Sequence, residues 1–294
     1  MNFIDHANYW LTTFSKKGQS PYKLSSEERN RIDQYCKLYT AQKLTSPVKV
    51  NSVSRMRKAS YSYDWYRIFE TTDERLCHFA FGDVQYVPDE PTFTKSRPIT
   101  ENNHNNVLLP LNTIRHFSFV HDSLSFYQKA NKAVWRGAAY KDHRKKFLEQ
   151  TRSMENFDCK DTSRFTPKDF LGKSKNHLPI KHQLNYRYIF AIEGNDVASN
   201  LKWVMASNSV AVMPKPRFET WFLESQLIAG EHFIEISPDF DDIEEKLEPY
   251  FVNPKLALEI NREAKNYASQ FFQLDRQFEI AKHVAENYFC LIKK

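Results

Sequence analysis

Residues 186–247 constrain the fold of this chain more than any other stretch, because short apolar runs alternate there with helix-like segments. Apolar runs at residues 186–192, 209–213 and 232–236 predict strands, and residues 218–227 predict a helix between the last two. Strands that alternate with helices are typical of a parallel, doubly wound sheet. The sequence therefore predicts an α/β fold.

The first predicted strand leads into the tight turn Gly194-Asn195-Asp196, and the pattern after this turn predicts a helix that begins at once. A strand, a turn and a helix N-terminus together direct free backbone N–H groups and the positive end of the helix dipole toward a phosphate. Ligands of doubly wound sheets bind beyond the carboxyl ends of the strands. We therefore expect a functional site at residues 194–199.

Composition limits the class of protein. The 294 residues suffice for two domains, and contents of 41% hydrophobic and 15% aromatic residues are ample for buried cores. With only six glycines and neither a GxGxxG nor a P-loop motif, the chain is not expected to hold phosphate in a glycine-rich loop. The net charge of +6 fits an anionic partner such as a nucleotide, a phosphorylated glycan or a membrane surface.

Cysteine usage and hydropathy favour a cytoplasmic protein. The four cysteines are far apart and form no CxxC pair, which favours free thiols in a reducing compartment. The first residues lack the pattern of a signal peptide, and no run approaches about 18 consecutive apolar residues. These patterns leave open whether the protein is free in the cytoplasm or bound peripherally at the inner membrane.

The remaining elements are predicted from capping residues and apolar spacing. They are a helix after a capping box at residues 25–28, strands at residues 47–56, 76–81 and 133–137, a basic helix at residues 142–151, and two helices over residues 254–292. Two polar segments, residues 95–106 and 152–178, are predicted to be irregular. The domain boundary is placed near residue 128, which gives an N-terminal domain of residues 1–128 and a C-terminal domain of residues 129–294.

Short sequence blocks carry a further signal through their order and spacing. They are Trp135-Arg136-Gly137, Tyr186-Arg187-Tyr188-Ile189-Phe190, residues 193–203, Ser207-Asn208-Ser209, Phe218-Glu219-Thr220-Trp221-Phe222, and His232-Phe233 with Asp241-Asp242-Ile243 after it. Together they resemble glycosyltransferase family 90, most closely its bacterial branch of LpsA-type lipopolysaccharide glycosyltransferases. The resemblance implies a GT-B fold, with two Rossmann-like domains facing a cleft and helices at the C-terminus.

The same resemblance implies a reaction. One sugar, a hexose, would move from a UDP-sugar to a hydroxyl of a lipopolysaccharide core or related surface glycan, with inversion and without a metal or other cofactor. Arg136, with Gly137 beside it, falls in the family's block for the donor, and Arg144 falls where the animal branch has another arginine. An arginine fork matches the oxygens of a diphosphate leaving group. A surface ion pair is the alternative for Arg136.

The turn after the predicted strand supplies the second part of the donor site. Gly194, Asn195, Asp196 and Ser199 are candidate contacts for the phosphate or the ribose, although asparagine and aspartate at a turn also cap helices. The eukaryotic branches carry an arginine where this chain has Asn200, which shifts the phosphate contact toward Arg136 and the backbone.

Glu219 is expected at the start of a helix, where a carboxylate can accept hydrogen bonds from the ribose hydroxyls. The alternative is a first-turn glutamate that complements the helix dipole.

Asp83 is the candidate general base, because inversion needs one group to take the proton of the acceptor hydroxyl. It ends an apolar run, and the animal branch has its base before a similar segment. A turn aspartate after Gly82 is the alternative. Lys95 and Arg97 are expected to bind either a phosphorylated acceptor or the donor diphosphate, or to lie on a loop surface.

A metal site is not expected. Asp239-Phe240-Asp241 has the DxD spacing that some glycosyltransferases use for a divalent ion, but helix capping explains it better. The rival hypothesis for the whole chain is a protein that binds nucleic acid or an anionic glycan through the basic residues 49–58. A transferase that binds UDP without catalysis is a third possibility.

Overall fold

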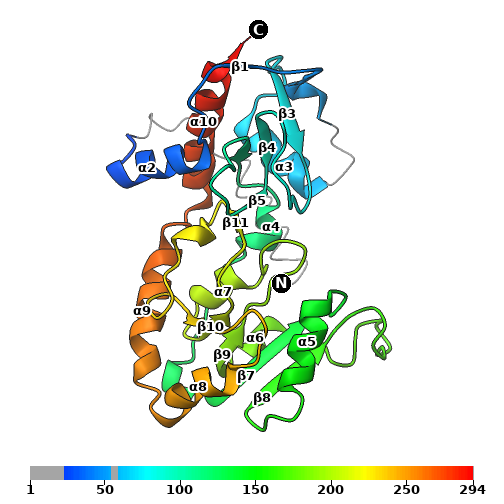
Figure 1. Ribbon diagram of the computed structural model, residues 1–294, viewed down its shortest axis with the longest axis vertical. Coiled ribbons are helices and arrows are strands. Elements are labelled where there is room, and N and C mark those ends of the chain that lie inside the picture. Colours follow the sequence, from blue (N-terminus) through cyan, green and yellow to red (C-terminus); the bar gives the residue numbers. More distant parts are fainter. Residues whose placement is uncertain (1–22, 54–58, 294) are drawn as a thin grey trace.

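The structure is a computed structural model that describes residues 23–53 and 59–293 (Figure 1). Residues 1–22, on which the signal-peptide prediction rests, lie outside the described part. So do residues 54–58, which hold the end of the strand predicted at residues 47–56 and three of the basic residues of the rival nucleic-acid hypothesis. None of the helices in the described part combines the length and the apolar character that a membrane crossing requires.

The C-terminal half is built on a five-stranded parallel sheet in the order β12-β10-β9-β7-β8. Its strands are β7 (Ala130–Gly137), β8 (Phe157–Asp161), β9 (Tyr186–Phe190), β10 (Val210–Met213) and β12 (Ile234–Glu235). The centre is fully buried, as Val134, Ile189 and Ala211 show. The predicted parallel sheet of an α/β fold is therefore confirmed, with the strand order of flavodoxin-like sheets.

Helices cover this sheet and extend from it (Figure 1). They are α5 (Asp142–Thr151), α6 (Ile180–Gln183), α7 (Leu201–Met205), α8 (Ile243–Val252) and α9 (Leu256–Ser269). The helix predicted at residues 142–151 is confirmed, but α7 begins only at Leu201. The prediction of a helix directly after the Gly194 turn was wrong, because residues 198–200 still separate the turn from α7.

Other predictions were also wrong. The strand predicted at residues 47–56 reaches only Lys49 in the structure, where residues 50–52 form a 3-10 helix. Residues 218–227 form the strand β11 (Phe218–Thr220) and the short 3-10 helix η3 (Glu224–Gln226), because β11 pairs with β5 (Ser96–Pro98) from the other half of the chain. The segment at residues 152–178 is not irregular throughout, since it contains the edge strand β8. Strands β5, β8 and β11 each form by pairing with a segment elsewhere in the sequence, which a local pattern does not show.

The N-terminal half has a second sheet in the order β2-β3-β4-β6, in which β3, β4 and β6 are parallel and β2 (Val48–Lys49) is antiparallel. Its other strands are β3 (Leu76–Ala80), β4 (Thr92–Thr94) and β6 (Asn106–Leu108). The same half contains α2 (Ser26–Tyr35), η1 (Val50–Ser52), α3 (Ala59–Ile68), α4 (Thr113–His116) and the separate strand β1 (Gln42–Lys43). The capping box predicted for α2 is present, with Ser25 and Glu28 as its two members.

The last helix returns to this N-terminal half. Helix α10 (Leu274–Leu291) packs against α2 and α3, and β13 (Ile292–Lys293) pairs with β1 (Figure 1). Tyr288 of α10 is fully buried, packs against Phe93 with ring centroids 4.1 Å apart, and donates a hydrogen bond to the Pro91 carbonyl. The two sheets are separate, and the GT-B arrangement of the whole chain stays a prediction.

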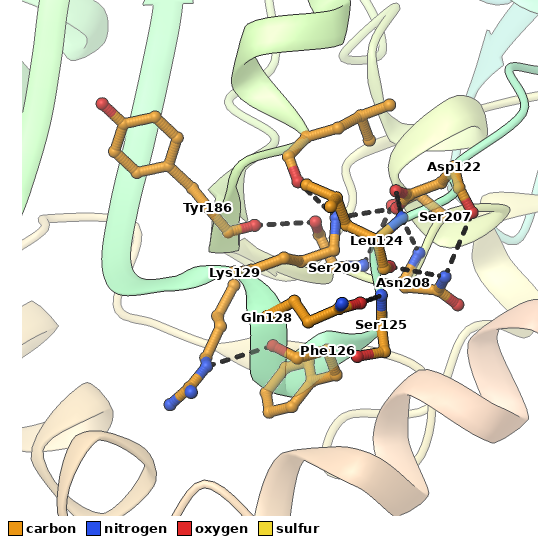
Figure 2. A network of polar contacts seen from close by, with 12 residues as sticks. Asp122, Leu124, Ser125, Phe126, Gln128, Lys129, Tyr186, Ser207, Asn208 and Ser209 are labelled. Atoms are coloured by element: carbon orange, nitrogen blue, oxygen red, sulfur yellow. Dashed lines mark hydrogen bonds and ion pairs between the residues drawn. The ribbon is translucent and has the colours of Figure 1, made fainter.

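The connection between the halves is held by buried polar contacts (Figure 2). Lys129 Nζ lies 2.7 Å from Asp122 Oδ2, which also accepts a hydrogen bond from the Asn208 backbone N–H at 2.8 Å. Ser209 donates to the Tyr186 carbonyl at 2.7 Å. Tyr186 and Ser209 lie at the amino ends of β9 and β10, so the connection is fixed at the edge opposite the carboxyl ends. The predicted boundary near residue 128 falls in this connection and stays a prediction.

Candidate functional site

The strand order places a switch point between β7 and β9. The chain proceeds from β7 to β8 on one side of the sheet and from β9 to β10 on the other, while β7 and β9 are themselves neighbours. Loops from the carboxyl ends of two such strands diverge, and the space between them is where ligands of doubly wound sheets bind. The loops here follow Gly137 of β7 and Phe190 of β9, and the second loop holds four of the predicted donor residues, Gly194, Asn195, Asp196 and Ser199.

Arg136 lies at this edge, but its guanidinium is already bound by the protein. Nη2 lies 2.7 Å from Asp158 Oδ2, and Nε donates to the Asn176 carbonyl at 2.8 Å. Nη1 donates to the Trp135 carbonyl at 2.8 Å, and the side chain is only 7% exposed. Arg136 thus ties β7 to β8 and to the loop after β8, and its predicted contact with a diphosphate stays a prediction.

Arg144 on α5 holds the two loops of the switch point together. Its Nε donates to the Glu193 carbonyl at 2.9 Å, Nη2 to the Ile192 carbonyl at 2.7 Å and Nη1 to the Ala138 carbonyl at 3.1 Å. All three acceptors are neutral, and within the described residues no carboxylate forms an ion pair with Arg144. The positive charge of Arg144 therefore stays at the switch point, between the loops that follow β7 and β9.

Both glycines of the predicted site have close neighbours. A Cβ at Gly137 would lie 2.4 Å from the Trp135 ring, a distance that real side chains do not adopt. A Cβ at Gly194 would lie 3.3 Å from Arg144 Nη2. The absence of side chains at Gly137 and Gly194 thus lets Trp135 and Arg144 pack under the two loops.

Residues of the N-terminal half reach the same place. The buried Lys95 Nζ lies 2.6 Å from Asp83 Oδ1 and 2.7 Å from Asp196 Oδ2. Asn195 Nδ2 donates to Asp83 Oδ2 at 3.1 Å. Asp83 follows β3 and Lys95 follows β4, whereas Asn195 and Asp196 follow β9. The carboxyl ends of the two parallel sheets therefore meet, and they bring together four residues that the sequence had singled out separately.

These contacts set the charge of the cluster. Burial alone would raise the pKa of Asp83, but the hydrogen bond and charge of Lys95, together with Asn195 and Arg115, hold that pKa below its usual value. Burial would lower the pKa of Lys95, and the two aspartates and Tyr61 raise it instead. Asp83 is therefore ionised at neutral pH and can accept a proton. The N–H groups of Asn195 to Val197 have no acceptor in the described part of the chain.

Arg115 is the residue that sequence reasoning missed. It lies on α4, after the carboxyl end of β6, and it is exposed. Burial lowers the pKa of Arg144, and the nearby charge of Arg115 lowers it further. The charge of Arg115 also helps Lys95 to hold the pKa of Asp83 below its usual value. No side-chain partner for its guanidinium exists among residues 23–53 and 59–293. An arginine shortly after the apolar residues 107–111 was the signal that could have identified it.

Comparison with known proteins identifies the family. The sequence profile of glycosyl transferase family 90 matches residues 110–294 of this chain. The chain belongs to glycosyl transferase family 90. It is also similar to the O-glucosyltransferase LpsA of Dichelobacter nodosus, with 39% identity over 279 residues that cover 94% of this chain and 86% of the relative. The protein is therefore a glycosyltransferase, and a sugar donor and a glycan acceptor are its substrates.

Two predicted ligands of this family 90 enzyme lie inside the protein. Arg97 and Glu219 are 0% and 1% exposed and form an ion pair, with Nε 2.7 Å from Oε1. Arg97 is on strand β5 and not in a polar loop, and Glu219 is on strand β11 and not at the start of a helix. The pair joins the two halves, because β5 and β11 come from different halves. Their roles as ligands stay untested predictions, and the local structures expected for them were wrong.

The remaining candidates are more open. Ser199 is partly exposed just before α7. Asp239 of the DxD sequence lies 2.5 Å from Lys146, and Asp242 accepts a hydrogen bond from the Ser237 N–H. In the part of the chain that is described, no group of three or more His, Cys, Asp or Glu side chains could hold a metal ion.

Proposed function

We propose that this family 90 glycosyltransferase moves one hexose from a UDP-sugar to a hydroxyl of a lipopolysaccharide core or related surface glycan, with inversion at the anomeric carbon. Glucose is the proposed sugar, because the similar protein from Dichelobacter nodosus is named an O-glucosyltransferase. The observation that carries the proposal is the cluster of Asp83, Lys95, Asn195 and Asp196 at the switch point. It sets a carboxylate from one sheet beside the switch point of the other.

The diphosphate of the donor is proposed to lie between the Gly194 turn and the loop after β7. Arg144 and Arg115 contribute positive charge there, and the N–H groups of Asn195 to Val197 are free to donate. Such preorganised donors stabilise the charge that develops on the leaving UDP, and in many transfer reactions this stabilisation lowers the barrier more than any other single effect. Arg136 supports this edge through Asp158 in the present conformation. The charges of Arg115 and Arg144 support a transfer that uses no metal.

Asp83 is proposed to act as the base. The acceptor oxygen attacks the anomeric carbon, the bond from that carbon to the diphosphate breaks, and the hydroxyl proton passes to Asp83 as UDP leaves. Because Lys95 and Asn195 depress the pKa of Asp83, the carboxylate is a weak base while both contacts persist. An acceptor hydroxyl that displaces Asn195 would restore part of its basicity.

The partners and location follow from the reaction. The UDP-sugar and the glycan acceptor are the proposed partners, with no nucleic acid. Lys49, the described cation of the rival basic segment, already pairs with Glu74 at 3.1 Å. We propose a cytoplasmic enzyme, since nucleotide sugars are cytoplasmic substrates in the reaction that the resemblance implies. Peripheral contact with the inner membrane is compatible with this location.

Asp83→Asn tests the proposed mechanism. The amide keeps the size of the side chain and can still face Asn195, but it cannot accept a proton, so UDP affinity measured by calorimetry should stay within about threefold while transfer falls at least about 100-fold. Asp89→Asn, a substitution in the loop after Asp83, is the matched control and should leave both values unchanged. Transfer by Asp83→Asn at the wild-type rate would remove Asp83 as the base. Failure of wild-type protein to bind UDP would overturn the donor assignment.

A further inference from the structure

The loop after β8, residues 162–179, is not used by the proposed reaction and has an unusual surface. Its tip presents Phe170 and Leu171, which are 94% and 65% exposed, and Phe165 earlier in the loop is 75% exposed. In Figure 1 the loop projects beyond α5 at the side of the C-terminal sheet. Large apolar side chains grouped on one projecting loop mark an interaction site more often than chance exposure does.

The tip is a turn closed by hydrogen bonds. The Gly172 N–H donates to the Asp169 carbonyl at 3.0 Å, and the Asp169 N–H donates to the Lys173 carbonyl at 2.7 Å. The Asp169 carboxylate accepts from the N–H groups of Leu171 and Lys173 at 2.9 and 2.8 Å, and Gly172 has a φ of 72° that favours glycine. This turn presents Phe170 and Leu171 outward, where both side chains are exposed.

Basic residues flank the apolar tip in the sequence. Residues 160–181 contain six lysines and arginines but only two aspartates. The basic residues are all exposed, and they are Lys160, Arg164, Lys168, Lys173, Lys175 and Lys181. The two aspartates are partly buried and hold the loop itself, since Asp161 accepts from Ala139 and Ser163 and Asp169 forms the turn. The outer surface of the loop is therefore positive as well as apolar.

The base of the loop is anchored at the carboxyl edge of the sheet. The Asn176 carbonyl accepts the hydrogen bond from Arg136 Nε, and Asn176 Nδ2 donates to the Asp161 carbonyl at 2.8 Å. Inside the loop, Thr166 and Ser174 share a hydrogen bond of 2.6 Å between their hydroxyls. The apolar tip is thus fixed relative to β7 and β8.

We propose that residues 162–179 dock the protein on an anionic phospholipid surface. Phe170 and Leu171 enter the boundary between head groups and acyl chains, while the surrounding lysines and arginines lie against the lipid phosphates. Apolar insertion combined with basic contacts is the combination that gives reversible attachment to such surfaces. Charge complementarity favours an anionic lipid surface over a second copy of the protein, because two copies of the same loop would bring two positive surfaces together.

Co-sedimentation of the full chain with vesicles tests the proposal. Wild-type protein should bind vesicles of equal parts phosphatidylcholine and phosphatidylglycerol, bind pure phosphatidylcholine more weakly, and lose binding as salt screens the lysines. F170S/L171S should lower the partition coefficient at least about tenfold, because two inserted side chains are removed. K173E/K175E should lower binding to the mixed vesicles at least about tenfold and leave the weak binding to neutral vesicles unchanged.

The control removes two other exposed apolar side chains, away from the loop. Val252 and Leu256, which are 74% and 51% exposed near the junction of α8 and α9, give V252S/L256S, which should bind like wild type. Wild-type protein that sediments with neither vesicle, or F170S/L171S that binds as well as wild type, would overturn the proposal. So would a wild-type dimer that F170S/L171S converts to a monomer without any vesicle binding. Lipid binding is measured without sugar donor, so its failure is distinct from failure of the proposed transfer.

Discussion

Lys95 lies between two carboxylates, and its replacement by methionine has a calculable effect. Methionine keeps most of the volume and removes the ammonium, which leaves Asp83 and Asp196 facing each other without the nitrogen that lies 2.6 and 2.7 Å from them. Removing one partner of a buried ion pair destabilises a protein by about 3–5 kcal/mol. Asp83 is 28% exposed, so solvent screens part of the repulsion, and we expect a loss near the lower limit, about 3 kcal/mol. Because domains are stable by about 5–15 kcal/mol, the variant should still fold.

The stability of this variant should also depend on pH in a defined direction. In the wild type the pKa of Asp83 is depressed, so its contribution to stability is present at neutral pH and is lost as the pH falls through that depressed pKa. Without Lys95, burial and the neighbouring carboxylate raise the pKa of Asp83 above its usual value. The folded variant then binds a proton more readily than the unfolded chain. The free energy of unfolding of Lys95→Met should therefore rise as the pH falls from neutral to about 5.

Urea unfolding followed by tryptophan fluorescence, at neutral pH and at about pH 5, measures both effects. Lys129→Met is the matched control, because Lys129 is an equally buried lysine that lies 2.7 Å from Asp122 in the connection between the halves. It should lose a comparable amount of stability at neutral pH while UDP affinity of the folded protein is unchanged. A Lys95→Met variant that stays within about 1 kcal/mol of wild type and follows the same pH dependence would refute this reasoning.

Two further predictions concern the switch point. Arg115→Ala should change the free energy of unfolding by less than about 0.5 kcal/mol, since the side chain is exposed and has no partner in the described part of the chain, but it should weaken UDP binding about tenfold in calorimetry. A loss of stability without loss of affinity would contradict the role given to Arg115. Gly137→Ala should destabilise the protein by about 1–3 kcal/mol in the same unfolding assay, because its Cβ would lie 2.4 Å from Trp135; an alanine variant as stable as wild type would show that the ring can move aside.

The strongly patterned elements could be predicted from the sequence. Strand β9 was found from an apolar run and helix α5 from a short basic segment after a turn, and both are local signals. Strand β8 was missed because Phe-Asp-Cys-Lys-Asp is a half-exposed edge strand with polar residues on both faces. The β5–β11 pair was missed for a different reason, since its buried Arg97 and Glu219 satisfy each other only after distant segments meet.

The candidate site shows the same division. Asp83 and Asp196 could be singled out because they follow apolar runs at turns, and Lys95 because it begins the basic sequence Lys-Ser-Arg-Pro. That one lysine joins both aspartates could not be read from the sequence, since the contact depends on how two sheets face each other. Arg136 shows another limit of the sequence, because its ion pair with Asp158 could not be read from the family block, and its contact with a phosphate stays a prediction.

The return of α10 to the first sheet has a consequence for biosynthesis. Phe93 and its neighbours obtain part of their cover from Tyr288, a residue that the ribosome adds nearly two hundred positions later. At about 5–20 residues per second, that delay lasts about ten to forty seconds. During this interval the aromatic interior of the nascent N-terminal half is open to water and to other chains, so chaperone demand should be greatest before translation reaches the final helix.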